Sequence, residues 1–231
     1  MNSLSIRLLK ALVLLSFTTF GQLNYSDTYK EEFREAIEFY NSNKKQFSKA
    51  SKNVDLNPEF IFSIVAPEIS QFNTVINDVE LYSLKVLYTQ FGKDYSDFSV
   101  GYFQMKPSFI ESLEKYIDQH PKYFKDYKHI LFKNPNSKNS RIERLERLNT
   151  LDWQLKYLTL FCAVVEYRFK NSIYKNSEDK LKFFSTAYNS GFEKSKEQLT
   201  IMGFKRFFPK IGVEKYNYSE ISVSFYKEIR R

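Results

Sequence analysis

The chain has 231 residues, 42% of them hydrophobic, and its 35 Lys and Arg against 27 Asp and Glu give a formal charge of +8. This length favours one sizeable core, with or without extensions, over two full domains. The basic residues alternate with acidic ones and form no dense block, so nucleic acid is not predicted as a partner. The net charge itself favours attraction to anionic wall polymers or membrane surfaces.

The first residues of the chain predict export. Arg7 and Lys10 precede an apolar stretch at residues 11–20, and Gly21 suits cleavage before Gln22. We interpret residues 1–21 as the signal peptide of a periplasmic or secreted protein, because the apolar stretch is too short to span a bilayer. An uncleaved N-terminal anchor is the alternative.

The rest of the chain predicts an all-α protein. It contains only 6 Gly and 6 Pro, and its apolar residues recur at spacings of three and four, the period of a helix face. A first helix is expected to begin at Ser26 or Asp27, and a second is capped by Asn57 with Pro58 at its first position. Further helices are expected at residues 78–91, from Pro107, at residues 150–170 in the centre of the core, from Ser177 to Asn189, and from Ser219.

The segments between these helices are predicted from composition. Residues 93–106 are expected to be irregular, and residues 121–140 to form a long loop or short helical pieces. The alternating charges of residues 141–147 are typical of a solvated helix face. The single Cys162 lies in an apolar run and is expected to be buried as a small hydrophobic residue.

Glu68 stands at the end of the uncharged run of residues 61–67. A carboxylic acid among apolar neighbours resists ionising, so Glu68 is a candidate general acid. The competing interpretation is a solvated residue at the polar edge of a helix. Pro67 removes one helical hydrogen bond, which predicts a kink there or a new turn that starts at Glu68.

Other chemistries find little support in the sequence. The two histidines, His120 and His129, lie in a charged loop without ligand-like spacing, so no metal or cofactor is predicted. The remaining carboxylates, amides and phenols suit cleavage of a glycosidic bond. Gln104, close to the flexible Gly101, offers a donor and an acceptor to sugar groups, and Tyr188 ends a helix where its hydroxyl could approach an acid.

In this order, these stretches resemble the soluble lytic transglycosylase and goose-type lysozyme superfamily. Its hallmark is a Glu that ends an apolar helix, then Gly-Leu-Met-Gln with a Pro three residues later, then Ala-Tyr-Asn-x-Gly. Glu68, the Gly101 to Gln104 stretch with Pro107, and residues 187–191 match these features. The chain departs from the pattern where Ile69 replaces Ser and in the 36 positions from Glu68 to Gln104, which make the helix at residues 78–91 an insertion.

The resemblance implies a lysozyme-like helical domain with extra helices at residues 57–231, preceded by an N-terminal helical extension at residues 22–56. It implies cleavage of the β-1,4 bond between N-acetylmuramic acid and N-acetylglucosamine in peptidoglycan strands, with a 1,6-anhydro product. Glu68 would act as both acid and base. The implied substrate-binding residues are Gly101, Tyr102, Gln104, Tyr188 and Asn189.

Three alternatives remain open at this point. A hydrolytic muramidase would need a second carboxylate to position water, for which Glu80, Asp94 and Asp97 are candidates. A wall-binding or assembly protein with the same fold and no turnover is the second alternative. The third is a binder of membrane surfaces or nucleic acid that is driven by net charge.

Overall fold

A computed structural model describes residues 24–72, 78–209 and 212–231, although the side chains of residues 78–80 are not included. The predicted signal peptide lies outside the described residues. Within them the chain forms helices and two isolated β-bridges but no strand, which confirms the all-α prediction. None of the described helices is long and apolar enough to cross a membrane.

Most of the predicted helices are present close to their expected bounds. The described helices are α2 (Tyr25–Thr28), α3 (Lys30–Ser51), α4 (Pro58–Ser70), α5 (Asp78–Phe91), α6 (Pro107–Gln119), the 3₁₀ helix η2 (Lys125–Ile130), α7 (Lys138–Leu148), α8 (Leu151–Arg168), α9 (Ser177–Ser190), α10 (Lys196–Met202) and α11 (Tyr218–Glu228). The predicted first helix is divided at Tyr29 into α2 and α3, and α10 was not predicted.

Of the two alternatives predicted at Pro67, a kink or a new turn at Glu68, the new turn is wrong, because α4 continues through Pro67 to Ser70. Asn57 starts this helix as predicted, and its side chain accepts a hydrogen bond from the Phe60 amide at 2.7 Å. Pro67 lies in the last turn, where its missing amide removes one bond near the helix end. Glu68 is therefore carried by the same rigid helix as the apolar run before it.

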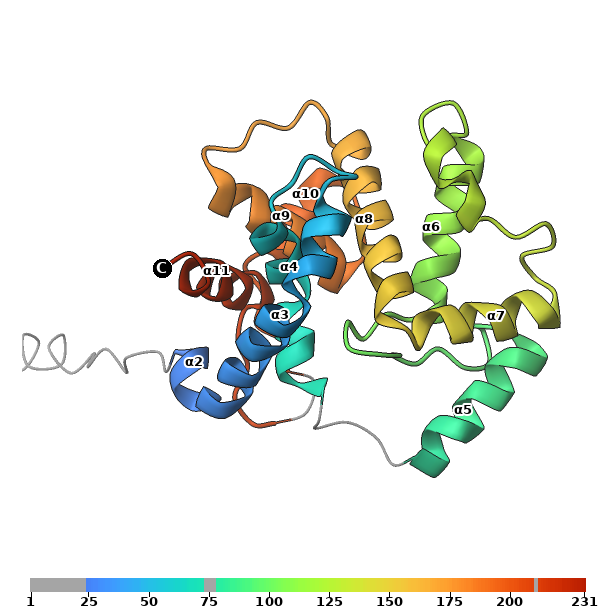
Figure 1. The fold of residues 1–231 in the computed structure, drawn as a ribbon, viewed down its shortest axis with the longest axis horizontal. Coiled ribbons are helices and arrows are strands. Elements are labelled where there is room, and N and C mark those ends of the chain that lie inside the picture. Colours follow the sequence, from blue (N-terminus) through green and yellow to red (C-terminus); the bar gives the residue numbers. More distant parts are fainter. Residues whose placement is uncertain (1–23, 73–77, 210–211) are drawn as a thin grey trace, which may run out of the picture.

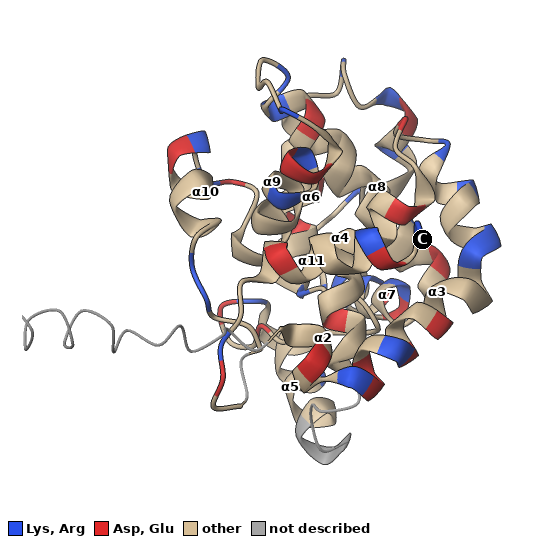
Figure 2. Ribbon diagram, turned by 90° about the vertical axis from the view of Figure 1, so that its left-hand side faces the viewer, with Lys and Arg blue, Asp and Glu red and all other residues tan. Residues whose placement is uncertain are grey.

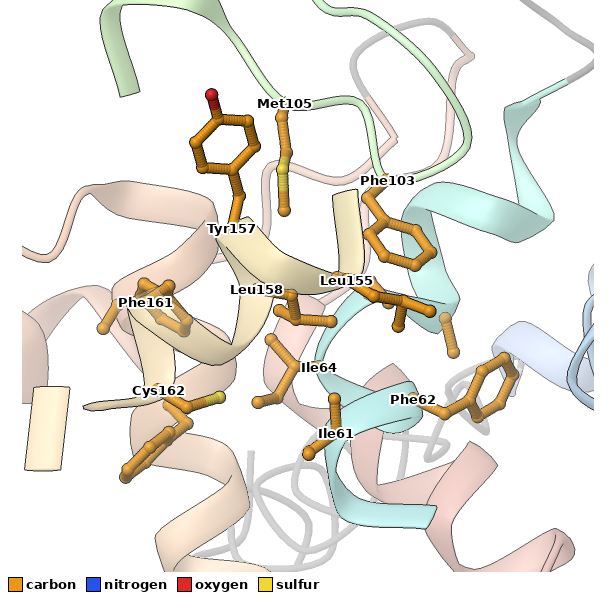
Figure 3. Packing of buried hydrophobic residues seen from close by; sticks show 14 of the residues in the cluster. Ile61, Phe62, Ile64, Phe103, Met105, Leu155, Tyr157, Leu158, Phe161 and Cys162 are labelled. Atoms are coloured by element: carbon orange, nitrogen blue, oxygen red, sulfur yellow. The ribbon is translucent and has the colours of Figure 1, made fainter. Parts of the chain in front are cut away.

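The helices are arranged on two sides of α8 (Figure 1). On one side α3, α4, α9 and α11 pack together, and on the other α6 and α7 pack against α8 while α5 packs against α7. Ile61 and Ile64 of α4 lie opposite Leu158 of α8 in the core, where Cys162 is also fully buried (Figure 3). The predicted central position of α8 in the core is confirmed.

The prediction of a solvated face at residues 141–147 holds for Ile142, Glu143 and Glu146, which are exposed, but is wrong for the arginines. Arg144 is fully buried, and its guanidinium donates to both carboxylate oxygens of Glu114, at 3.2 and 2.6 Å, and to the Tyr88 hydroxyl at 2.8 Å. The Arg144 side chain also lies 3.4 Å from Glu111. We call these four residues the Arg144 cluster. It joins α7 to α6 through an ion pair and to α5 through the hydrogen bond to the Tyr88 hydroxyl.

Two further arginines of α7 face the same way, because residues 141, 144 and 147 follow each other at the helical spacing of three. Arg141 donates to the carbonyls of Thr89 and Gln90 at the end of α5, at 2.9 and 3.0 Å. Arg147 is held between the rings of Phe132 and Trp153, 4.2 and 4.1 Å from their centroids. The arginines that the charge pattern assigned to solvent thus make contacts within the protein.

Candidate active site

A groove of about 490 Å³ lies where α4, α6, α9 and the loop before α6 meet. Three of the predicted site residues, which are far apart in the sequence, line it together: Glu68, Gln104 and Tyr188. Asn189 lines it as well. The sequence motifs at residues 68, 101–104 and 187–191 are therefore brought to one place by the fold. Further groove residues are Asp97, Ser99, Met105, Lys106, Ser108, Phe109, Ser112, Ser190, Gly191 and Glu193.

Glu68 occupies the transition from core to groove. The helix residues 60–67 before it are buried, whereas Glu68 itself is half-buried. Its charge acts on two phenols: the pKa values of Tyr188 and Tyr218 are both raised well above the usual range, first by burial and then by Glu68. Both hydroxyls therefore stay protonated, so Glu68 has two neutral phenols as neighbours.

The loop that carries Gln104 is a tight turn closed by a bridge between Val100 and Met105. Their backbones exchange two hydrogen bonds, at 2.9 and 3.2 Å. Gly101 has φ +70, and a Cβ there would lie 1.9 Å from the Gln154 side chain and 2.6 Å from the Leu148 carbonyl. Only glycine fits this position, both for its backbone angle and for the close approach of α8.

Gln154 of α8 fixes the loop from the side of the core. It is fully buried on α8, accepts a hydrogen bond from the Phe103 amide at 2.8 Å and donates to the Leu148 carbonyl at 2.8 Å. Phe103 and Met105 point from the loop towards α8, and both side chains are buried (Figure 3). The loop is thus held on a buried amide and two buried side chains.

Gln104 adopts a left-handed backbone with φ 48, which costs a residue with a side chain roughly 1 kcal/mol. Its side-chain amide donates to the Gly101 carbonyl at 2.9 Å. This bond uses one amide hydrogen and keeps the rest of the amide at the groove. The strained conformation is maintained by the fixed loop and aims a polar side chain at the groove wall.

Tyr188 connects α9 to this loop. Its hydroxyl donates to the Phe103 carbonyl at 2.6 Å, so it positions the loop that presents Gln104, and its oxygen still has acceptor capacity. The helix ends as predicted, with Gly191 at φ 102 and its amide bonded to the Ala187 carbonyl. That stop leaves Asn189 exposed at the rim of the groove.

The structure does not bring all predicted residues to the groove. Tyr102 points to a different contact, with its ring 4.8 Å from that of Phe39 and 4.7 Å from that of Phe72. Asp94 is exposed and does not line the groove. The Glu80 side chain lies outside the described residues.

Asp97 does line the groove, but both of its carboxylate oxygens are bonded to the start of α6. One accepts from the Ser108 amide at 3.1 Å, and the other accepts from the Ser108 hydroxyl at 2.8 Å and from Lys106 at 3.1 Å. The first of these bonds satisfies an amide donor at the N-terminus of a helix, which is a structural role. Of the three candidate second carboxylates, Asp97 is the one that lines the groove. Both of its oxygens already accept hydrogen bonds within the protein.

Two residues near Glu68 escaped sequence reasoning. Tyr218, at the first turn of α11, donates to the Ile64 carbonyl one helical turn before Glu68, at 3.0 Å. Glu193 follows the last motif and lines the groove. No motif marks Tyr218, since it approaches Glu68 only when α11 packs on α4. Glu193 was within reach of sequence reasoning, two residues beyond Gly191.

The described residues define an all-helical protein with a polar groove built around one half-buried carboxylate. Among them, no group of three or more His, Cys, Asp or Glu side chains could hold a metal ion. No protein-family model, curated protein or solved structure matches this chain.

Proposed function

We propose that this protein cleaves the β-1,4 bond between N-acetylmuramic acid and N-acetylglucosamine in peptidoglycan, as a lytic transglycosylase with a lysozyme-like domain. One observation carries the proposal: Glu68 shares a groove with Gln104, Tyr188 and Asn189, which come from three separate segments. One half-buried carboxylate at the end of an apolar helix, beside amides that have donors and acceptors for sugar groups, suits a one-acid mechanism.

The proposed reaction uses Glu68 twice. As the acid, it donates its proton to the glycosidic oxygen while the bond from that oxygen to C1 of the muramoyl residue breaks. The muramoyl C6 oxygen then attacks C1, and the Glu68 carboxylate takes the proton of that hydroxyl. The products are a new N-acetylglucosamine end and a 1,6-anhydro ring, and Glu68 is protonated again.

The surrounding residues support this cycle in distinct ways. Tyr188 and Tyr218 remain neutral, so they place no charge next to an acid that must hold a proton. Gln104 and Asn189 would bind hydroxyl or N-acetyl groups of the glycan. Lys106 at the groove would attract the carboxylates of stem peptides.

The test is mass spectrometry of the muropeptides that the protein releases from purified sacculi, with Glu68→Gln as the matched variant. Anhydro-muropeptides from the parent protein and a loss of at least about 10³-fold in the variant are expected. The variant should keep the parent melting temperature, because amide and carboxylate have nearly the same shape.

Other results point elsewhere. Reducing-end products would replace the proposal with a hydrolytic muramidase, and Asp97→Asn would then be the variant that identifies the second carboxylate. No release by folded protein that still binds sacculi would show a wall-binding protein instead. Release that survives in Glu68→Gln would contradict the assigned role of Glu68.

A further inference from the structure

A second surface lies away from the groove, in the loop that follows α10. Four consecutive residues, Phe204, Lys205, Arg206 and Phe207, are all exposed there. The side chains of Phe204 and Phe207 are 80% and 57% exposed, and Ile201 on the preceding helix is 60% exposed. We call residues 201–207 the Phe204 surface. Large apolar side chains at this exposure, interleaved with cations, are unusual for a surface that only meets water.

The exposure is not the result of an untethered loop. The Asn217 side chain donates to the Gly203 carbonyl at 2.5 Å, directly before the surface. Directly after it, Phe208 is buried and forms a two-hydrogen-bond bridge with Tyr216. Both ends are therefore fixed to the folded domain, which holds the two exposed rings outside the core.

The location of this surface relates it to the start of the chain. Tyr25 lies against the bridge that ends the surface, with its ring 5.3 Å from Tyr216 and 6.3 Å from Phe208. The 23 residues before Asn24 include the apolar stretch at residues 11–20. The described chain therefore begins at the same corner of the molecule as the Phe204 surface.

We propose that the Phe204 surface binds the interface of an anionic phospholipid bilayer. Lys205 and Arg206 complement the charge of the headgroups, and the two rings and Ile201 enter the boundary of the acyl chains. Anionic wall polymers share the charge but offer no apolar phase for the rings, so the aromatic residues favour the lipid. The segment is at the outer edge of the molecule, with its Lys and Arg residues on the stretch after α10 (Figure 2).

This surface is separate from the proposed wall cleavage and does not depend on it. Its role is to hold a basic protein at the membrane while the groove remains available. Binding and cleavage can therefore be measured independently, with Glu68→Gln as a control that should bind vesicles like the parent.

The experiment uses the full chain with Phe204→Trp and vesicles of equal parts phosphatidylglycerol and phosphatidylcholine that carry brominated acyl chains. The only native tryptophan, Trp153, supplies the background signal in the parent chain. Ile173→Trp is the matched control, because Ile173 is 94% exposed in the connection between α8 and α9. Quenching by the brominated chains reports how deep the tryptophan at position 204 or 173 lies in the bilayer. Membrane binding by residues 1–21 alone would therefore not produce the signal expected at position 204.

We expect a blue shift and strong quenching for Phe204→Trp, and neither for Ile173→Trp. Replacing Phe204 and Phe207 by Ser should lower vesicle partitioning at least about tenfold, and replacing Lys205 and Arg206 by Gln should lower it about tenfold on anionic vesicles. Pure phosphatidylcholine should bind at least about tenfold more weakly than the anionic vesicles.

Three results would overturn the proposal. One is a Phe204→Trp signal that does not change with vesicles, and another is equal quenching of Ile173→Trp. The third is binding to lipid-free sacculi that depends on Phe204 and Phe207 as strongly as vesicle binding does, which would assign the surface to wall polymers.

Discussion

The groove and the Arg144 cluster are two polar regions on different faces of α6. Ser108 and Ser112 of this helix face the groove, whereas Glu111 and Glu114 face Arg144. In the cluster every charged group has a partner inside the protein, and Arg144 has no exposed surface. In the groove, the half-buried Glu68 and Gln104 and the exposed Asn189 surround a space that can take a ligand.

The difference between the two regions shows how polar residues that stabilise the fold differ from polar residues that can act on a ligand. A buried ion pair must satisfy its own members, because desolvation of each charge costs several kcal/mol. A catalytic site instead presents polar groups to a groove. Other residues, whose own hydrogen bonds are made inside the protein, hold those groups in place. Gln154 and Tyr188 are such supports, since both bond to the Phe103 backbone.

Arg144→Ala should break the cluster and give the largest loss of stability. It leaves Glu114, which is 4% exposed, without its cation, and we expect a loss of about 3–5 kcal/mol in unfolding free energy. Urea unfolding measures it, with the exposed Arg34→Ala as a control that should change little. Replacing Arg144 and Glu114 together by Met should recover part of the loss, and no recovery would contradict the ion-pair explanation.

The same variant has a predicted pH dependence. Burial raises the pKa of Glu114, and Arg144 opposes this shift, so the pKa rises further when Arg144 is removed. An acid whose pKa is higher in the folded state supports folding fully at low pH and loses that contribution as pH rises through the folded value. The deficit of Arg144→Ala should therefore be smaller at about pH 5 than at about pH 8. An equal deficit at both would show that Glu114 keeps its charge.

Gly101→Ala should disturb the groove because it displaces Gln154, which holds the loop that carries Gln104. The added Cβ would meet Gln154 and the Leu148 carbonyl at a left-handed φ, so a loss of about 2 kcal/mol or more is expected, together with lost cleavage. Gly92→Ala is the matched control, since Gly92 has φ +90 but open space around it, and should cost about 1 kcal/mol. Equal losses in both variants would mean that close packing at Gly101 has no effect of its own.

Tyr188→Phe sharpens the comparison with a smaller change. It removes the hydrogen bond to the Phe103 carbonyl, worth about 1 kcal/mol, and loosens the loop that presents Gln104. We expect cleavage of sacculi to fall about tenfold. Tyr102→Phe should leave activity within about twofold, because Phe keeps the ring contacts with Phe39 and Phe72. A larger loss for Tyr102→Phe would move that residue into the substrate site.

The smallest effect is expected in the alkaline stability of Glu68→Gln. Folded Tyr188 and Tyr218 have raised pKa values, so their contribution to stability is complete below about pH 10 and declines as pH rises further. Without the Glu68 charge the two folded pKa values come down, so the decline that begins near pH 10 should end at a lower pH, and its total should shrink by less than about 1 kcal/mol. A steeper decline than in the parent would contradict the placement of Glu68 beside these phenols.

Local chemistry determined much of this protein in advance. Helical spacing of apolar residues, the Asn57 cap and the glycine stops at Gly92 and Gly191 predict α4, α5 and α9 closely, because these signals act within one turn of the backbone. The order of the three motifs predicted which side chains meet, and Glu68, Gln104 and Tyr188 do line one groove.

The tertiary structure alone decided which polar residues are buried and which neighbours Glu68 has. Charge alternation predicts a wet helix, yet α7 packs its arginines against α5 and α6, where Glu114 and Tyr88 satisfy Arg144. Tyr218 reaches Ile64 over 154 positions of sequence, and Asp97 is bonded to the start of α6. Such pairings depend on how helix faces meet in space, and a pattern that is read along one chain segment contains no information about the partner.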